Sequence, residues 1–251
     1  MASPSTDDLW FRRFRPSAEA AERLVCFPHA GGSASFYVPV ASALSPGVDV
    51  VAVQYPGRQD RRHEPGPSSV AALAEQVAQA MRTWDDRPVT FFGHSMGAVV
   101  AFEVARRAGR TPVRIFASGR RAPSRTRAES VHTRDDDGVI AELRALSGTD
   151  AQVFQDEDLL RMVLPAIRSD YRAVETYRAE PGAAVDCPIT VLTGDADPRT
   201  SLEEARAWSE HTTADSEVRV FPGGHFFLSE RPADVLAVLN EHFTAAPARH
   251  A

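Results

Sequence analysis

The sequence predicts an α/β fold in which a mostly parallel central sheet is covered by helices on both faces. Six short apolar runs, rich in Val, Ile and Phe, alternate along the chain with longer helix-like stretches. Each apolar run is continuous, which is typical of strands buried on both faces of a parallel sheet. The chain has 251 residues, of which 43% are apolar and 25% charged. This length and composition suit one domain built on one sheet.

The predicted elements follow one another in a regular order. The strand-like runs cover residues 23–27, 48–53, 89–93, 113–118, 189–194 and 217–221. Helix-like patterns lie between them and begin at Ser69, Met96 and Ser201. A last pattern covers residues 231–243, with Pro232 in its first turn and Ser229 as the expected cap. Strands that alternate with helices predict parallel pairing through right-handed crossovers.

One interval between two predicted strands is longer than a single crossover helix requires. Residues 119–188 separate two predicted strands and contain two helix-like stretches, at 135–148 and 156–177. We expect a helical lid insertion at about 122–185 within a single domain of residues 1–251. Only the tail after residue 244 has the composition of a frayed end.

The charged residues exclude several classes of function. With a net charge of −6, the chain lacks the basic excess that the phosphate contacts of a nucleic-acid binder require. All 28 basic side chains are arginines. A P-loop lysine, a Schiff-base lysine and a Ser–Lys dyad are therefore excluded.

The cysteines and the apolar runs predict a cellular compartment. Cys26 and Cys187 each lie inside a strand-like run, where a thiol behaves as a small buried hydrophobe of a reducing compartment. The N-terminal stretch does not have the pattern of a signal peptide, and no apolar run approaches the length of a membrane span. We expect a cytoplasmic protein that does not bind membranes.

The segment "GHSMG", residues 93–97, contains the candidate nucleophile Ser95. The G-x-S-x-G pattern is weak by itself, but here a strand-like run precedes it and a helix-like run follows it. Such a turn exposes the serine hydroxyl, and Gly93 and Gly97 allow the strand and the helix to approach closely. The alternative is a glycine-lined turn with a serine that only caps the helix.

A serine hydroxyl needs a base, and His225 is the best candidate. It follows the last predicted strand, on a loop flanked by glycines in "FPGGHFF". Most of the other histidines lie in polar or helical-surface segments and are expected to be solvated; these are His132, His211, His242 and His250. His94 is expected to point away from the turn that holds the serine.

The base needs a carboxylate to fix its tautomer, and two candidates follow the strand at 189–194. In the order Ser…Asp…His of α/β-hydrolases, the acid follows a strand between the other two residues. Asp197 is favoured because it lies two positions further into the loop than Asp195, which adjoins the strand end and suits a loop-organising role. The loop after residue 118 holds no acid before Glu129.

A tetrahedral intermediate needs two N–H donors. One is expected to be the backbone amide of Met96, directly after the serine. The second is expected from the glycine-rich loop at residues 29–32, and we favour the amide of Ala30. The alternative is that this loop needs its glycines only for its turn.

Seven segments carry a resemblance to a known family. They are, in order, "VCFPHAGGSASFY", "VQYPGRQDRRHEP", "FFGHSMGAVVAFEVAR", "ASGRRAPS", "LPAIRSDYRAVETY", "CPITVLTGDADP" and "FPGGHFFL". Together they resemble the type II thioesterases that accompany polyketide synthases and nonribosomal peptide synthetases. The resemblance extends from Leu24 to Phe243.

The resemblance implies an α/β-hydrolase fold with a helical lid. It places the nucleophile on Ser95, the base on His225, the acid on Asp197, and the oxyanion donors on the amides of Ala30 and Met96. It implies an editing enzyme of antibiotic biosynthesis that hydrolyses wrong or stalled acyl groups from carrier proteins.

The implied partner is an acyl or peptidyl carrier protein whose own phosphopantetheine arm carries the acyl group. We expect no metal and no cofactor, and we expect a monomer. Two alternatives stay open: a general carboxylesterase or lipase with the same triad, and a non-catalytic module that binds carrier proteins.

Two arginine clusters are candidates for contact with that partner, although a run of charges is more often a solvated face. One holds Arg120, Arg121, Arg125 and Arg127, and the other holds Arg58, Arg61 and Arg62. Both follow predicted strands, where α/β sites open. They are candidates for contact with the phosphate of the arm or with an acidic carrier surface. The alternative is two solvated charged faces.

Overall fold

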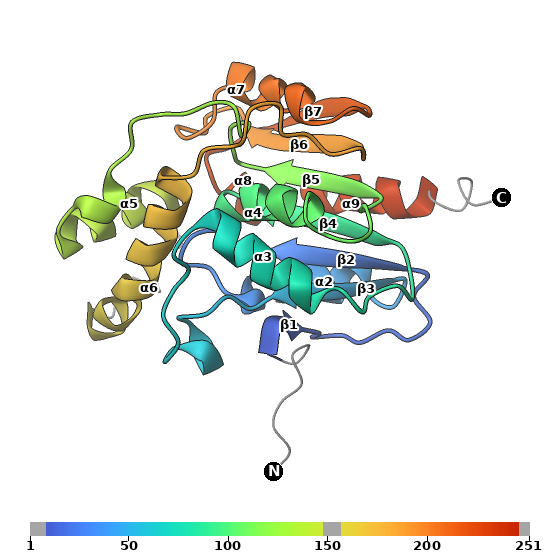
Figure 1. Cartoon of the computed structure of the whole chain (residues 1–251), viewed down its shortest axis with the longest axis horizontal. Helices are drawn as coiled ribbons and strands as arrows, with labels where there is room; N and C mark the ends of the chain where they lie inside the picture. Colours follow the sequence, from blue (N-terminus) through green and yellow to red (C-terminus); the bar gives the residue numbers. More distant parts are fainter. Residues whose placement is uncertain (1–8, 148–156, 246–251) are drawn as a thin grey trace, which may run out of the picture.

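The computed structural model describes residues 9–147 and 157–245, and its centre is one seven-stranded sheet (Figure 1). The strand order is β1-β3-β2-β4-β5-β6-β7, and β1 is antiparallel to β3 while all other neighbours are parallel. The strands are β1 (Phe11–Arg12), β2 (Glu22–Phe27), β3 (Val48–Val53), β4 (Val89–His94), β5 (Arg114–Ser118), β6 (Ile189–Gly194) and β7 (Ser216–Phe221). The predicted mostly parallel sheet is confirmed.

The continuous apolar runs form strands because both faces of the sheet are covered. Successive side chains of a strand point to opposite faces. In β2, Val25 and Phe27 accordingly pack in one hydrophobic cluster, and Leu24 and Cys26 pack in the other. The six predicted strands match the observed ones to within one residue at each end. The two-residue strand β1 is too short to produce a recognisable pattern.

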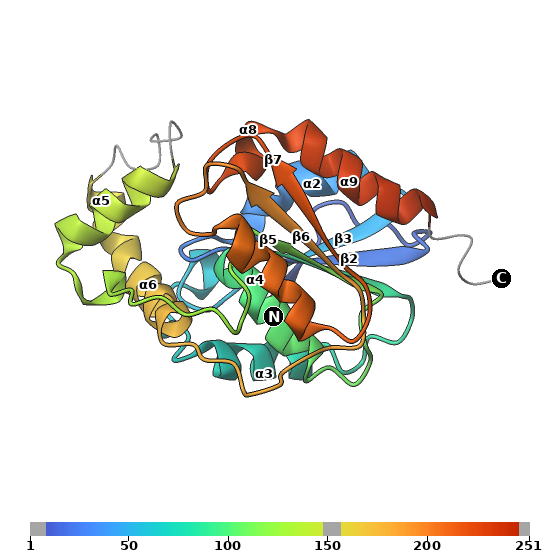
Figure 2. The same ribbon diagram turned by 90° about the horizontal axis from the view of Figure 1, so that it is seen from above.

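The helices form one layer on each face of the sheet (Figure 2). One layer contains α3 (Val70–Ala80), α4 (Met96–Ala105) and α7 (Leu202–Arg206). The other contains α2 (Val38–Leu44), α8 (Phe227–Glu230) and α9 (Pro232–Ala245). The sheet therefore lies between two cores.

Helix boundaries follow from capping, with two corrections. The Ser69 side chain accepts a hydrogen bond from the Ala72 amide at 3.1 Å and starts α3. Pro232 is the first residue of α9, as predicted. Ser229, however, lies inside α8, so the expectation that it caps the last helix is wrong. The helix expected from Ser201 ends at Arg206, and the chain continues as a 3₁₀ helix.

The interval between β5 and β6 contains helices α5 (Asp136–Ser147) and α6 (Glu157–Glu175). Both lie beside the carboxyl ends of the parallel strands, on the left in Figure 1. A small hydrophobic cluster, including Val139, Leu143, Leu164 and Ile167, joins the two helices. The interval is therefore helical and has its own core.

The two cysteines are free and buried, as expected. Burial raises the pKa of the Cys187 thiol to about 12 and also raises that of the Cys26 thiol, so neither is a reactive thiolate. Among the described residues, no helix combines the length and apolarity needed to span a membrane.

Candidate functional site

Ser95 occupies the sharp turn between β4 and α4. Its backbone has φ 54° and ψ −117°, a conformation that L-residues with a side chain rarely adopt. A Cβ atom at Gly93 would lie 2.2 Å from the Gly97 carbonyl oxygen, and one at Gly97 would lie 2.0 Å from the Phe27 carbonyl oxygen. Only glycine fits at both positions, and this allows helix α4 to lie directly against the sheet. The turn presents the Ser95 hydroxyl at the edge of the sheet where the parallel strands have their carboxyl ends.

His225 and Asp197 complete a chain of hydrogen bonds with Ser95. The Oγ atom of Ser95 lies 3.0 Å from Nε2 of His225, and Nδ1 of His225 lies 3.0 Å from both carboxylate oxygens of Asp197. A carboxylate only accepts hydrogen bonds, so Nδ1 carries the proton and Nε2 accepts from the serine. The three residues follow β4, β7 and β6, whose carboxyl ends share one edge of the sheet. The structure brings all three predicted residues together.

The two candidate carboxylates have different partners. Asp197 is buried and accepts a further hydrogen bond from the Arg199 amide at 2.8 Å, which fixes the carboxylate against His225. Asp195 instead accepts from the Gly223 amide at 3.0 Å and ties the loop after β6 to the loop after β7. Of the two candidates, Asp197 is therefore the one that contacts His225, and its role as the acid stays a prediction.

Two further imidazoles lie near His225: His94 is buried, and His29 is partly buried and lines the cavity. Burial, together with the nearby His225, lowers the pKa of His29 to about 3 and that of His94 well below its usual range. His94 points away from Ser95, and its Nδ1 lies 3.0 Å from the Ser118 hydroxyl. Both side chains are therefore neutral at pH 7 and only weakly basic, which makes them poorer proton acceptors than an ordinary imidazole.

The remaining histidines correct one expectation. His211 is buried rather than solvated, and its ring nitrogens contact the Ser124 amide and the Ala183 carbonyl. His132 lies against Glu175, and His242 lies 2.9 Å from the Thr90 hydroxyl. His250 lies outside the described residues.

The loop that carries Ala30 is held by helix α6. The Gly31 amide donates to Oδ2 of Asp170 at 2.8 Å, and Arg58 forms an ion pair with the same oxygen. Asp170 is fully buried. The Gly31 N–H is thereby occupied, which leaves the amide of Ala30 as the candidate donor of this loop. The roles of the Ala30 and Met96 amides stay predictions.

The sequence gives no sign of this Arg58–Asp170 contact. Its two partners are 112 residues apart in the chain. The loop glycine and the buried charge pair become connected only when α6 packs on the sheet edge.

A cavity of about 700 Å³ opens above Ser95 and His225. Its apolar wall comes mainly from α5 and α6: Leu143, Val163, Ile167, Tyr171 and Val174. The loop at residues 29–32 also lines the cavity, and it packs directly against α6 at Ile167. The long interval between β5 and β6 therefore supplies a large part of the chamber.

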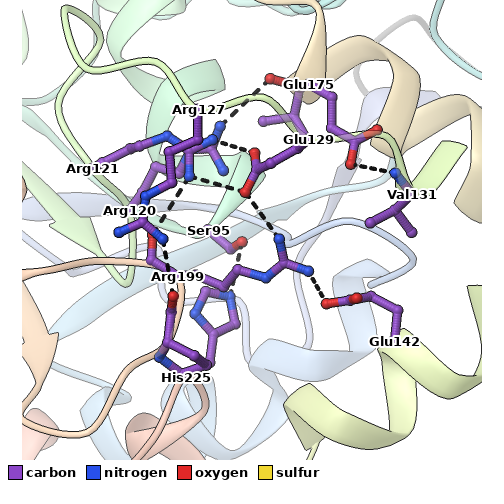
Figure 3. Close-up of polar contacts among 12 residues, drawn as sticks. Ser95, Arg120, Arg121, Arg127, Glu129, Val131, Glu142, Glu175, Arg199 and His225 are labelled. Carbon is purple, nitrogen blue, oxygen red and sulfur yellow. Dashed lines mark hydrogen bonds and ion pairs between the residues drawn. The ribbon is translucent and has the colours of Figure 1, made fainter.

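The other wall of the cavity is charged (Figure 3). Arg120, Glu129, Glu175 and Arg199 line it. Glu129 accepts from Arg121 at 3.1 Å and from Arg199 at 2.9 Å. Burial favours a raised pKa for Glu129, but Arg121, Arg120 and Arg199 outweigh it and hold the pKa at about 2. The carboxylate is charged at neutral pH.

The two predicted arginine clusters are not free basic surfaces. Arg58, Arg61, Arg120 and Arg121 are buried. Most of the clustered side chains have carboxylate partners: Arg58 with Asp170, Arg61 with Glu64, Arg121 with Glu129, Arg125 with Glu210 and Arg127 with Glu204. Most of these side chains are thus paired within the chain, which the sequence could not show, and their contact with a carrier protein stays a prediction.

The described part of the chain holds no group of three or more His, Cys, Asp or Glu residues arranged for a metal ion. The functional groups at this site are a serine hydroxyl, an imidazole and a carboxylate in hydrogen-bond contact.

Sequence comparison identifies the group of proteins with this arrangement. The profile of the family described as "Thioesterase domain" matches residues 22–243. The chain belongs to the thioesterase family.

Two relatives of this thioesterase come from Streptomyces. The "Probable cadicidin biosynthesis thioesterase" of Streptomyces griseus is 56% identical over 224 residues, which are 88% of this chain and 62% of the relative. The "Thioesterase PikA5" of Streptomyces venezuelae is 48% identical over 239 residues, which are 93% of this chain and 85% of the relative. The chain thus spans less than two thirds of the first relative's length and most of the second's.

Solved structures agree with the fold of this thioesterase. The type II thioesterase BorB from the borrelidin biosynthetic cluster matches with a TM-score of 0.89 and 52% identity, over 94% of this chain and 98% of the other. YbtT, a type II thioesterase of the yersiniabactin pathway, matches with a TM-score of 0.84 and 28% identity, over 94% and 99%. The resemblance to type II thioesterases and the predicted α/β-hydrolase fold are confirmed.

Proposed function

We propose that this thioesterase hydrolyses acyl thioesters on the phosphopantetheine arm of an acyl or peptidyl carrier protein, and thereby removes aberrant or stalled acyl groups during polyketide or nonribosomal peptide biosynthesis. The observation that carries the proposal is the hydrogen-bonded chain of Ser95, His225 and Asp197 at the floor of a cavity of about 700 Å³. The similarity to BorB and YbtT supports the class of substrate.

The geometry supports a two-step reaction. In the first step, Ser95 Oγ bonds to the thioester carbonyl carbon while its proton passes to Nε2 of His225. Asp197 stabilises the resulting imidazolium and keeps its orientation. The carbon–sulfur bond then breaks, the sulfur takes the proton from His225, and the acyl group stays on the serine.

Water completes the cycle. It donates a proton to His225 and adds its oxygen to the acyl-serine carbonyl, after which the proton returns to Ser95 and the free acid leaves. The proposed oxyanion donors are the amides of Ala30 and Met96, and each such donor contributes about 3 kcal/mol of transition-state stabilisation.

The remaining partners follow from this proposal. No cofactor of the enzyme enters the reaction, because the phosphopantetheine belongs to the carrier protein. All three triad residues come from one chain, so the proposed site functions in a monomer. Two buried free thiols suit a reducing compartment, and we place the enzyme in the cytoplasm.

The test compares hydrolysis of one acyl group presented as a carrier-bound thioester and as the matching oxygen ester, followed by intact mass. We expect faster turnover of the thioester, and a loss of about a thousandfold or more in kcat for Ser95→Ala. Ser209→Ala, an exposed serine outside the cavity, is the matched control and should keep the wild-type rate. Preferred turnover of the oxygen ester would favour a general esterase, and an inert wild-type protein would favour a binding module.

A further inference from the structure

Arg120 is a charged residue of the chamber that the proposed reaction does not use. It follows β5, the strand that lies between β4, which leads to Ser95, and β6, which leads to Asp197. Its exposed fraction is 8%, and it lines the same cavity as Ser95 and His225. Figure 3 labels Arg120 together with Ser95 and the other charged residues of this wall.

Arg120 differs from the neighbouring arginines because it has no carboxylate partner among the described residues. Arg121 and Arg199 both bind Glu129, and Arg127 binds Glu204. Within residues 9–147 and 157–245, the Arg120 guanidinium donates a single long hydrogen bond, 3.5 Å, to the Val174 carbonyl oxygen. At this length the bond is weak, so most of the hydrogen-bonding capacity of the group is unused by the protein.

The two carboxylates on the same wall are already occupied. Glu129 accepts hydrogen bonds from Arg121 and Arg199. Glu175 accepts from the Val131 amide at 2.9 Å and from the His132 amide at 3.1 Å. Burial, reinforced by Arg121, lowers the pKa of Arg120 to about 10, so the guanidinium still carries its charge at neutral pH.

Arg120 lines the cavity, so an acyl chain that reaches its guanidinium would displace solvent from it. A hydrocarbon chain would remove that solvent and supply no hydrogen-bond acceptor, which is unfavourable even with the charges of Glu129 and Glu175 nearby. A chain with an oxygen at this point would restore a charge-assisted hydrogen bond. Glu129 and Glu175 face the same cavity and oppose a carboxylate there, so a neutral oxygen fits best.

We propose that Arg120 donates a hydrogen bond to a keto or hydroxyl oxygen of the acyl chain, and that the enzyme thereby selects oxygenated acyl groups over saturated ones of equal length. This specificity role rests on the proposed thioesterase function. A site built to bond a polar group discriminates against analogues that lack it, because its own buried group is left unpaired.

The test measures kcat/KM for matched acyl groups on one carrier protein: hexanoyl, β-oxohexanoyl, β-hydroxyhexanoyl and δ-hydroxyhexanoyl. We expect the wild type to favour at least one oxygenated chain by about 10- to 100-fold over hexanoyl, the range of one hydrogen bond to a charged group. In Arg120→Met this ratio should fall to near one. Each ratio is taken within one variant, so a reduced folded fraction cancels.

Two further variants complete the test. Arg127→Met removes an arginine of the same loop that lies outside the cavity, and it should keep the wild-type ratio. Arg120→Lys keeps a cationic donor, so its preference for oxygenated chains should be smaller than that of the wild type but above one. If Arg120→Met does not fold, an unchanged preference in Arg120→Lys would contradict the inference.

Two results would overturn the inference: a wild-type ratio near one for every pair, or an unchanged ratio in Arg120→Met. Failure of the proposed function is distinct, because no carrier thioester would then be hydrolysed in a Ser95-dependent way.

Discussion

At the scale of single residues, Glu129 is the carboxylate that holds two arginines together at the charged wall of the chamber. Its carboxylate is nearly buried and contacts Arg121 and Arg199. Because these arginines outweigh the effect of burial, the pKa of Glu129 is about 2 rather than near 4.5. The charged form is therefore stabilised by folding.

We expect Glu129→Gln to reduce the free energy of unfolding at pH 7 by about 1–3 kcal/mol, less than the full pKa difference would give because solvent partly screens this carboxylate. A depressed folded-state pKa gives stability that is present above the unfolded pKa and is lost as the pH falls through the folded one. The difference between wild type and variant should shrink as the pH falls from about 4.5 toward 2. Urea unfolding of both proteins across this range measures it, and a constant difference would contradict the assignment.

The triad could be predicted from the sequence because each member has a local signal. Ser95, Asp197 and His225 each follow an apolar strand-like run, and the carboxyl ends of parallel strands share one edge of the sheet. The partners of the arginines could not be predicted, because Arg127 and Glu204 are 77 residues apart and meet only in the folded chain. For the same reason, His211 could not be recognised as buried.

At the scale of elements, helix α6 supports the loop that carries Ala30. Asp170 lies in the interior of α6 and accepts from the Gly31 amide while it pairs with Arg58. One helix turn earlier, Ile167 packs so closely that a Cβ atom at Gly31 would lie 3.0 Å from its side chain. Gly31 also has φ +77°, so the loop needs glycine for its backbone as well as for space.

We expect Asp170→Ala to lower the free energy of unfolding by about 3–5 kcal/mol, because it leaves Arg58 as an uncompensated buried charge. It should also lower kcat, because the Gly31 amide loses the acceptor that orients the loop. Asp170→Asn keeps an acceptor and should reduce kcat less than Asp170→Ala does. Urea unfolding and steady-state kinetics measure both effects.

The matched control for Asp170 is Arg172→Ala, an exposed residue of the same helix. It should change the free energy of unfolding by less than about 0.5 kcal/mol. If Asp170→Ala were equally mild, the buried pair would not hold the loop.

At the scale of the whole molecule, the chamber forms between the sheet edge and the helices of the long interval. The length of that interval and its two helix-like stretches predict α5 and α6 to within about three residues. The volume of the cavity could not be predicted, because it depends on how Leu143, Ile167 and Tyr171 pack above the serine. Whether α5 and α6 act as a lid stays a prediction.

We expect Val163→Trp to narrow the chamber from the α6 side and to lower kcat/KM for long acyl chains more than for acetyl. Met162 is the neighbouring residue, but it is 72% exposed and lies outside the cavity. Met162→Trp should therefore leave the ratio of long-chain to acetyl turnover unchanged. A chain-length series on one carrier protein measures both, and equal profiles for the two variants would place the acyl chain elsewhere.

The order of the strands has a consequence for how such an enzyme can diversify. The triad residues follow β4, β6 and β7, so β5 lies among them without supplying one. The segment after β5 nevertheless reaches the chamber through Arg120 and continues into α5 and α6. The residues proposed for hydrolysis and the segment proposed for recognition of the acyl chain therefore lie in separate stretches of the same chain. During evolution, substitutions in the segment after β5 can therefore change which acyl groups are accepted, while Ser95, Asp197 and His225 stay the same.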